Sequence, residues 1–160
     1  MVAISIGSSV KSIGEKAFFD CLNITSIVVS DSVESIGTAA FGKTSTETGK
    51  LESVDLGNGV KNIESDLFVG RRELKSINIG SSLEVIPELD NEKAPFGLDK
   101  SISELKNYTV SESNKKFGAL DGILYELFEV DGRKLKVAII DVPARNTVKR
   151  INIPLRYMKI

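Results

Sequence analysis

The stretch LESVDLGNGVKNIESDLF, residues 51–68, holds one complete copy of the pattern that decides the fold. Val54 and Leu56 flank a polar residue, which is the alternation of a short strand with one buried face. The turn residues Gly57-Asn58-Gly59 follow, and a second short strand precedes Phe68. The segment before Phe68 is too short for an independent helix, so we expect about one helical turn that places the phenylalanine in the core.

The same pattern recurs about every 23 residues, and phenylalanine ends each copy at Phe18, Phe41, Phe68 and, after an insertion, Phe96. Such a period is typical of solenoids, in which each unit buries its apolar face only by stacking on its neighbours. A lone unit buries too little apolar area to offset the entropy of ordering its chain. The sequence therefore predicts an α/β fold, a right-handed solenoid of short β-strands and single-turn helices.

One polar position of the repeat supports stacking in register. The residue that follows the first apolar position of each second strand alternates in charge, as Lys11, Glu34, Lys61 and Glu84. Stacked units would place these side chains next to one another with opposite signs. Exposed pairs of this kind contribute only a few tenths of a kcal/mol each, so the column indicates register more than stability.

Two insertions and one excursion interrupt the period. Extra residues fall in the polar run GKTSTETGK after Phe41 and between Ile86 and Leu105, and insertions in repeat proteins map to loops, often on a binding face. The pattern of residues 111–147 predicts an irregular β-rich insertion with turns at Asp121-Gly122 and Asp131-Gly132. We treat residues 1–160 as a single solenoid, with units of about 1–23, 24–50, 51–73, 74–104 and 105–160. The chain starts inside a unit without a polar cap, so we expect it to be a segment of a longer array.

Composition excludes several classes of function. A formal net charge of −1 gives no global attraction to nucleic acid or to an anionic membrane, and no apolar run approaches the roughly 20 residues needed to span a bilayer. The chain has 1 cysteine and no histidine, so it can form no internal disulfide, no histidine-ligated metal site and no catalytic triad that uses histidine. We expect no cofactor and no enzymatic activity.

Residues Gly37 to Thr44 match the phosphate-binding pattern GxxxxGK[ST], and Val137–Asp141 resembles the apolar strand whose aspartate supports magnesium. A phosphate-binding loop needs a buried parallel strand before it and a helix that opens at Lys43. Gly37 and Phe41 instead occupy the repeat slots of Gly14 and Phe18. Nucleotide binding is therefore a remote alternative.

The stretch SIGEKAFFDCLNITSIVVSDSVESIGTAAF, residues 12–41, resembles the BspA-type leucine-rich repeats, and FGALDGILY with LKVAIIDVPA resembles a segment often found beside them. Members of that family are mostly surface or secreted proteins of bacteria and some protists. The resemblance implies a leucine-rich-repeat solenoid that acts as a non-enzymatic adhesion or protein-binding module at the cell surface or after secretion. Its partner would be another protein, such as a host or neighbouring-cell surface protein. A structural spacer that projects another domain is the alternative.

The candidate contact residues are polar positions beside and within the first strands, where they would face solvent. They are Thr25, Glu52, Asp55, Lys75, Asn78, Lys106 and Thr109. The same positions also suit an ordinary solvated strand surface. Because Thr25, Glu52 and Lys75 vary while Ser26, Ser53 and Ser76 repeat, we favour binding over spacing.

Three other sequence features could suggest a function but are explained more simply by structural roles. Glu88, Asp90 and Glu92 could offer oxygen ligands to calcium but lack EF-hand spacing, so we expect a solvated loop and no metal. The sequons at Asn23 and Asn107 match glycosylation acceptors, although ladder and turn roles explain them as well. Cys21 is expected to be a small buried apolar residue.

Overall fold

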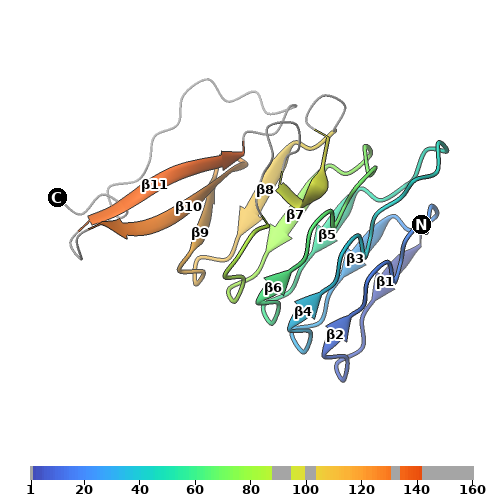
Figure 1. Ribbon diagram of the computed structural model, residues 1–160, viewed down its shortest axis with the longest axis horizontal. Coiled ribbons are helices and arrows are strands. Elements are labelled where there is room, and N and C mark those ends of the chain that lie inside the picture. The colour runs from blue at the N-terminus through green and yellow to red at the C-terminus, as the bar shows by residue number, and fades with distance from the viewer. Residues whose placement is uncertain (1, 88–94, 100–103, 131–133, 142–160) are drawn as a thin grey trace.

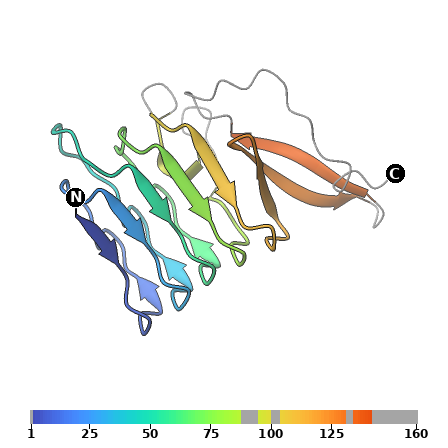
Figure 2. The same ribbon diagram turned by 180° about the vertical axis from the view of Figure 1, so that it is seen from behind.

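The computed structural model describes residues 2–87, 95–99, 104–130 and 134–141. Each repeat contributes one strand to a five-stranded parallel sheet, which we call the long sheet, in the order β1-β3-β5-β7-β8. Figure 2 shows these strands as parallel arrows along one side of the molecule. The strands are β1 (Ala3–Ser5), β3 (Ser26–Val28), β5 (Ser53–Asp55), β7 (Ser76–Ile79) and β8 (Asn107–Val110).

A second parallel sheet, the short sheet, runs along another side of the solenoid and is formed by the second strand of each repeat (Figure 1). Its strands are β2 (Ser12–Ile13), β4 (Ser35–Ile36) and β6 (Asn62–Ile63), and Asn62 forms a further parallel bridge to Val85. The expected leucine-rich-repeat solenoid with short strands is confirmed.

The insertions loop out without disturbing the register of the long sheet. Its Cα partners run Ala3, Ser26, Ser53, Ser76 and Asn107. Subtraction gives steps of 23, 27, 23 and 31 residues, so both insertions leave equivalent positions paired. Register persists because a slip of one residue would turn the buried side chain of every strand towards solvent.

Stacked side chains from successive repeats fill the core. Ile27, Val54 and Ile77, the central residues of neighbouring long-sheet strands, are each 2% exposed or less. The repeat phenylalanines form a second ladder, in which the ring centroids of Phe18 and Phe41 lie 5.6 Å apart and those of Phe41 and Phe68 6.0 Å apart. Phe96 continues this ladder after its insertion, with its ring 6.0 Å from Phe68. The phenylalanine slots predicted from the period are therefore confirmed.

The expected single-turn helices are absent from the first three repeats, where the segments before the phenylalanines are successive turns. Lys16, Ala39 and Asp66 occupy equivalent positions and all have φ between 52° and 56°. A left-handed residue cannot continue an α-helix. The N–H groups of these segments bond to the next repeat instead, as from Phe18 to Ala40 (2.8 Å) and from Phe41 to Leu67 (3.2 Å). The one helical segment of the described residues is the 3-10 turn η1 (Pro95–Gly97).

Residues 117–141 form a three-stranded antiparallel sheet, the terminal sheet, in the order β11-β10-β9. Its strands are β9 (Phe117–Leu120), β10 (Ile123–Val130) and β11 (Lys134–Asp141), and they lie at the end of the solenoid away from β1 (Figure 1). Phe117 and Leu124 belong to the same apolar core as the repeats. The expected β-rich segment with a turn at Asp121-Gly122 is confirmed, and it covers the exposed end of the last repeat.

Asn114 joins the terminal sheet to the fourth repeat. Its amide nitrogen donates to the carbonyl oxygens of Gly80 (2.8 Å) and Leu83 (3.2 Å). Its side-chain oxygen accepts hydrogen bonds from the N–H groups of Lys116 and Phe117, each at 2.8 Å. The turn at Asp131-Gly132 and the return of the repeat pattern after residue 147 lie outside the described residues, so these parts of the domain division stay predictions.

Candidate recognition surface

The seven predicted contact residues lie in two columns on the outer, solvent-facing side of the long sheet. The first column precedes the strands and contains Thr25, Glu52, Lys75 and Lys106, whose backbones are joined by successive hydrogen bonds of 2.9 Å. The second column contains Val28, Asp55, Asn78 and Thr109, which are register partners within the strands. The structure thus brings together the residues that the repeat spacing placed on one face.

Side chains within each column also contact one another. The Lys75 ammonium lies 2.7 Å from the Glu52 carboxylate, and both side chains are about half exposed. The Thr109 hydroxyl donates to the Asn78 side-chain oxygen at 2.8 Å. Asp55 is turned towards its own loop and accepts a hydrogen bond from the N–H of Gly57 at 2.9 Å. The surface is therefore ordered by its own contacts.

The short sheet carries the predicted column of alternating charge. The Lys61 ammonium lies 2.9 Å from the Glu34 carboxylate. This hydrogen bond is the main reason that the pKa of Glu34 is lowered and that of Lys61 is raised from their ordinary values. Both side chains are about half exposed, so the pair adds little stability. The predicted register of this column is confirmed at its centre.

The segment that matches a phosphate-binding loop does not have the geometry of one. Residues 37–42 form turns of the repeat, and Lys43 opens no helix. The Lys43 side chain is buried, and its ammonium donates to the carbonyl oxygens of Ser45 (3.1 Å) and Glu47 (2.8 Å) in its own loop. The lysine that would have to reach a phosphate is thus already bonded to the loop.

The loop of residues 43–48, which contains the first insertion, is also held from the preceding repeat. The Asp20 carboxylate accepts hydrogen bonds from the N–H groups of Thr44 (2.9 Å) and Ser45 (3.2 Å) and from the Thr44 hydroxyl (3.3 Å). These bonds, with the Thr44 N–H first, hold the pKa of Asp20 below its ordinary value. The insertion is therefore a braced loop, which projects at the upper right of Figure 1.

Arg71 is a buried charge that sequence reasoning missed, and it connects three repeats. Its Nε donates to the carbonyl oxygen of Phe41 (2.7 Å) and its Nη2 to that of Cys21 (3.2 Å). Its Nη1 lies 3.4 Å from the carboxylate of Glu73. No sequence signal separates Arg71 from the exposed Arg72 beside it, because both are arginines at the end of one repeat.

Next to Arg71 lies a hollow of about 450 Å³ between the 43–48 loop, the turn at Gly70 to Glu73, and Glu104. Arg72, Glu73 and Glu104 were not singled out from the sequence. The feature of the sequence that could have indicated the hollow is the insertion after Phe41, because it supplies the loop that forms one wall.

The remaining sequence candidates have modest roles. Cys21 is half-buried against the core rather than fully buried. Asn23 is exposed and accepts a hydrogen bond from the Lys50 ammonium at 3.0 Å, while Asn107 lies in β8. The Glu88, Asp90 and Glu92 group lies outside the described residues. Within the described residues, no cluster of acidic or cysteine side chains is arranged to hold a metal ion, and no helix has the length and apolarity that crossing a bilayer requires.

Comparison with known families identifies the family to which the chain belongs. The family model described as the BspA type leucine rich repeat region matches residues 1–92 in 6 copies. The chain belongs to this family. BspA-type repeats are typically non-catalytic. A search of curated proteins found no match to this sequence.

Three solved structures align with the chain, and the first of them shows a similar fold. A leucine-rich repeat protein from Eubacterium ventriosum aligns with a TM-score of 0.53 at 21% identity, over 92% of this chain and 40% of that one. The chain thus spans less than half of that protein. The pneumococcal vaccine antigen PcpA aligns with a TM-score of 0.36 at 16% identity, over 90% of this chain and 47% of the antigen. A leucine rich cell surface protein from Faecalibacterium prausnitzii aligns with a TM-score of 0.33 at 15% identity, over 96% of this chain and 57% of that protein.

Proposed function

We propose that this chain is a non-enzymatic recognition module that binds another protein through the outer face of its long sheet. One observation carries the proposal: in the first column the side chain changes from Thr25 to Glu52 to Lys75 to Lys106, while the backbone register stays fixed. A constant scaffold with varied outward side chains suits specific contacts with a partner.

The order of this surface is compatible with binding. Neighbouring parallel strands lie about 4.8 Å apart, so each column presents side chains at a regular spacing. Glu52, Lys75 and Asn78 are already held by neighbouring side chains. A preordered surface loses little conformational freedom when a partner docks, and this reduces the cost of association.

The family supports a proposed location and partner. BspA-type repeats occur mostly in surface or secreted proteins, so we propose that this chain acts at the cell surface or after secretion, with a host or neighbouring-cell surface protein as its partner. A structural spacer is the second candidate. The pairing of Glu52 with Lys75 and of Asn78 with Thr109 favours it, because a spacer needs only a surface that satisfies its own polar groups.

A charge exchange distinguishes the two functions. The double variant Glu52→Lys with Lys75→Glu keeps an ion pair at the same place but reverses the charge pattern of the long sheet. Glu34→Lys with Lys61→Glu makes the same exchange on the short sheet and is the matched control. Binding of the purified chain to an array of extracellular proteins would be measured for wild type and both variants.

Recognition through the long sheet requires that wild type binds a defined member of the array, and that the long-sheet exchange weakens this binding at least tenfold while the short-sheet exchange does not. A spacer would bind no member of the array. Equal binding by all three proteins would place the contact elsewhere. Thermal unfolding of both variants near the wild-type temperature would establish that neither loss comes from misfolding.

A further inference from the structure

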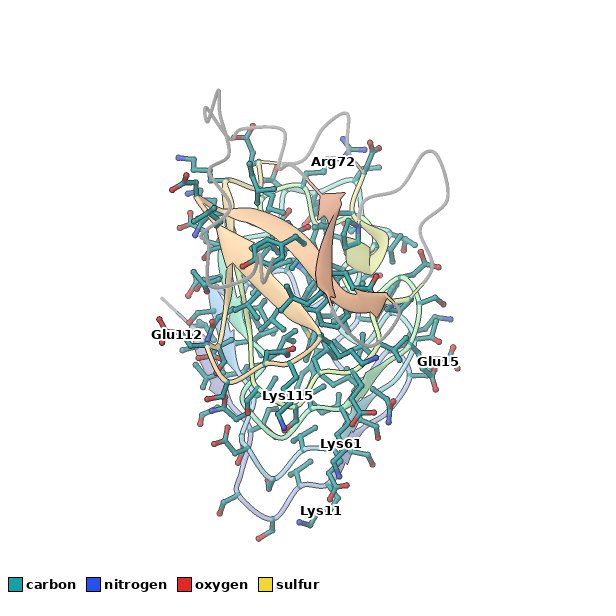
Figure 3. All side chains as sticks on the ribbon, turned by 90° about the vertical axis from the view of Figure 1, so that its left-hand side faces the viewer. Lys11, Glu15, Lys61, Arg72, Glu112 and Lys115 are labelled. Carbon is teal, nitrogen blue, oxygen red and sulfur yellow. The ribbon has the colours of Figure 1, made fainter. Side chains whose placement is uncertain are left out.

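The hollow beside the 43–48 loop has the size and the rigidity of a small-ligand site. Its volume of about 450 Å³ lies in the range of about 300–1,000 Å³ that small-molecule sites occupy. The loop that forms one wall is fixed by Asp20 from outside and by the Lys43 ammonium from within. Figure 3 shows Arg72 near the top of the molecule, with Lys115, Lys61 and Lys11 below it.

The wall of the hollow offers hydrogen-bonding groups of both kinds. Thr46, Glu47, Thr48 and Arg72 line it and are exposed, and the structure records no protein partner for these four side chains among the described residues. Two hydroxyls can donate or accept, the carboxylate accepts, and the guanidinium presents several donors in a fixed plane. Among the described residues, no aromatic or large aliphatic side chain lines the hollow. Carbon atoms of the same side chains and backbone also face the hollow, so a ligand that fits combines hydrogen-bonding groups with some apolar surface.

The charges around the hollow disfavour a simple ion. The carboxylates of Glu47, Glu73 and Glu104 are balanced by the positive charges of Lys43, Arg72 and the adjacent Arg71, so the hollow has no net charge that would attract an anion or a cation. The Lys43 ammonium directs two of its three N–H donors at carbonyl oxygens of its own loop. A neutral ligand with several hydroxyl groups meets no like charge and can use every free group. Its hydroxyls can donate to the Glu47 carboxylate and accept from the Arg72 guanidinium and the threonines.

We propose that this hollow binds a neutral hexose unit of a glycan. The contact would be separate from the outer face of the long sheet and would add a carbohydrate subsite to the module. Because none of the described lining residues is aromatic, we expect dissociation constants for single sugars in the millimolar range. Such an affinity suits a subsite that acts together with a larger contact or with repeated glycan units.

The test is titration of the ¹⁵N-labelled full chain with glucose, galactose, mannose and N-acetylglucosamine, followed by amide chemical shifts. At least one sugar should shift the amides of Thr46, Glu47, Thr48 and Arg72 in a saturable way. Arg72→Ala and Glu47→Gln should each weaken that binding at least tenfold. Lys115→Ala, at an exposed site that does not line the hollow, should bind as wild type does.

Three outcomes would overturn the proposal. The first is that none of the sugars shifts these amides. The second is that lysine amide, glycine or inorganic phosphate shifts them in place of the sugars, since this would identify an ionic ligand. The third is sugar binding that survives both Arg72→Ala and Glu47→Gln. The long-sheet charge exchange should leave sugar binding unchanged, so failure of the protein-binding function and failure of this subsite can be distinguished.

Discussion

Arg71 and Arg72 are neighbours in the chain with opposite surroundings. The Arg71 side chain is 1% exposed and bonds to groups from two preceding repeats as well as to Glu73. Arg72 is exposed and lines the hollow. A buried guanidinium is stabilising only while all its partners remain, since each desolvated carbonyl or carboxylate that loses a donor is costly.

We therefore expect Arg71→Met to lower the free energy of unfolding by about 3–5 kcal/mol, because it leaves Glu73 and two carbonyl oxygens without their donor. The adjacent change Arg72→Met should alter it by less than about 0.5 kcal/mol. Urea unfolding followed by circular dichroism measures both values. Similar values for the two variants would show that Arg71 does not hold the repeats together.

At the scale of elements, turns take the place of the expected helices, and the segment that matches a phosphate-binding pattern forms turns and a loop of the repeat. Both results have the same cause. Backbone N–H groups in these segments find partners in the next repeat, and left-handed residues such as Lys16 and Ala39 direct them there. The 43–48 loop is likewise held by another repeat, because Asp20 of the preceding repeat accepts hydrogen bonds from the N–H groups of Thr44 and Ser45.

The anchoring of the 43–48 loop should depend on pH. Because the pKa of Asp20 is lowered in the folded chain, its contribution is complete above the ordinary value of 3.8 and is lost as pH falls through the lower folded value. Asp20→Asn should therefore destabilise the chain at neutral pH, and the difference from wild type should shrink below pH 3.8.

The amide shifts of Thr44 and Ser45 report this anchoring directly. In wild type they should titrate with a midpoint below 3.8, and in Asp20→Asn that titration should be absent. Asp31→Asn changes a similar acceptor in another turn, where Asn58 donates to it, and should leave the Thr44 and Ser45 titration unchanged. A wild-type midpoint above 3.8 would contradict the assignment.

At the scale of the whole molecule, the terminal sheet closes one end of the solenoid. A stack of repeats leaves apolar surface exposed at each end, and capping elements cover it. Here Phe117 and Leu124 bring apolar side chains to the last repeat, and Asn114 bonds the sheet to Gly80 and Leu83. We therefore expect that the 111–130 segment stabilises the folded chain by covering and bonding to the neighbouring repeats.

Asn114→Asp tests this coupling with a side chain of nearly the same shape. A carboxylate can still accept from Lys116 and Phe117, but it places negative charge against two carbonyl oxygens in a buried site. We expect a loss of about 2–4 kcal/mol and faster amide hydrogen exchange in β7 and β8 as well as in β9. Ser113→Ala, at the exposed neighbour, should change neither quantity. Faster exchange confined to β9 would mean that the sheet and the repeats unfold independently.

The sequence by itself determined the features that recur. The unit of about 23 residues, the phenylalanine ladder and the Lys61–Glu34 pair follow from it, because stacking places equivalent positions of successive units side by side. The two columns of the long sheet follow for the same reason. Their role in binding is a proposal that rests on side-chain variation and on the family.

Tertiary structure decided the features that occur once. Arg71 reaches Cys21 across 50 residues, and the hollow is built from three separate segments, so neither has a periodic signal. The choice of turns over helices was likewise not visible in one unit, because the acceptors that favour turns belong to the next one. Repetition makes contacts between equivalent positions predictable, whereas contacts between non-equivalent positions depend on how the repeats are packed.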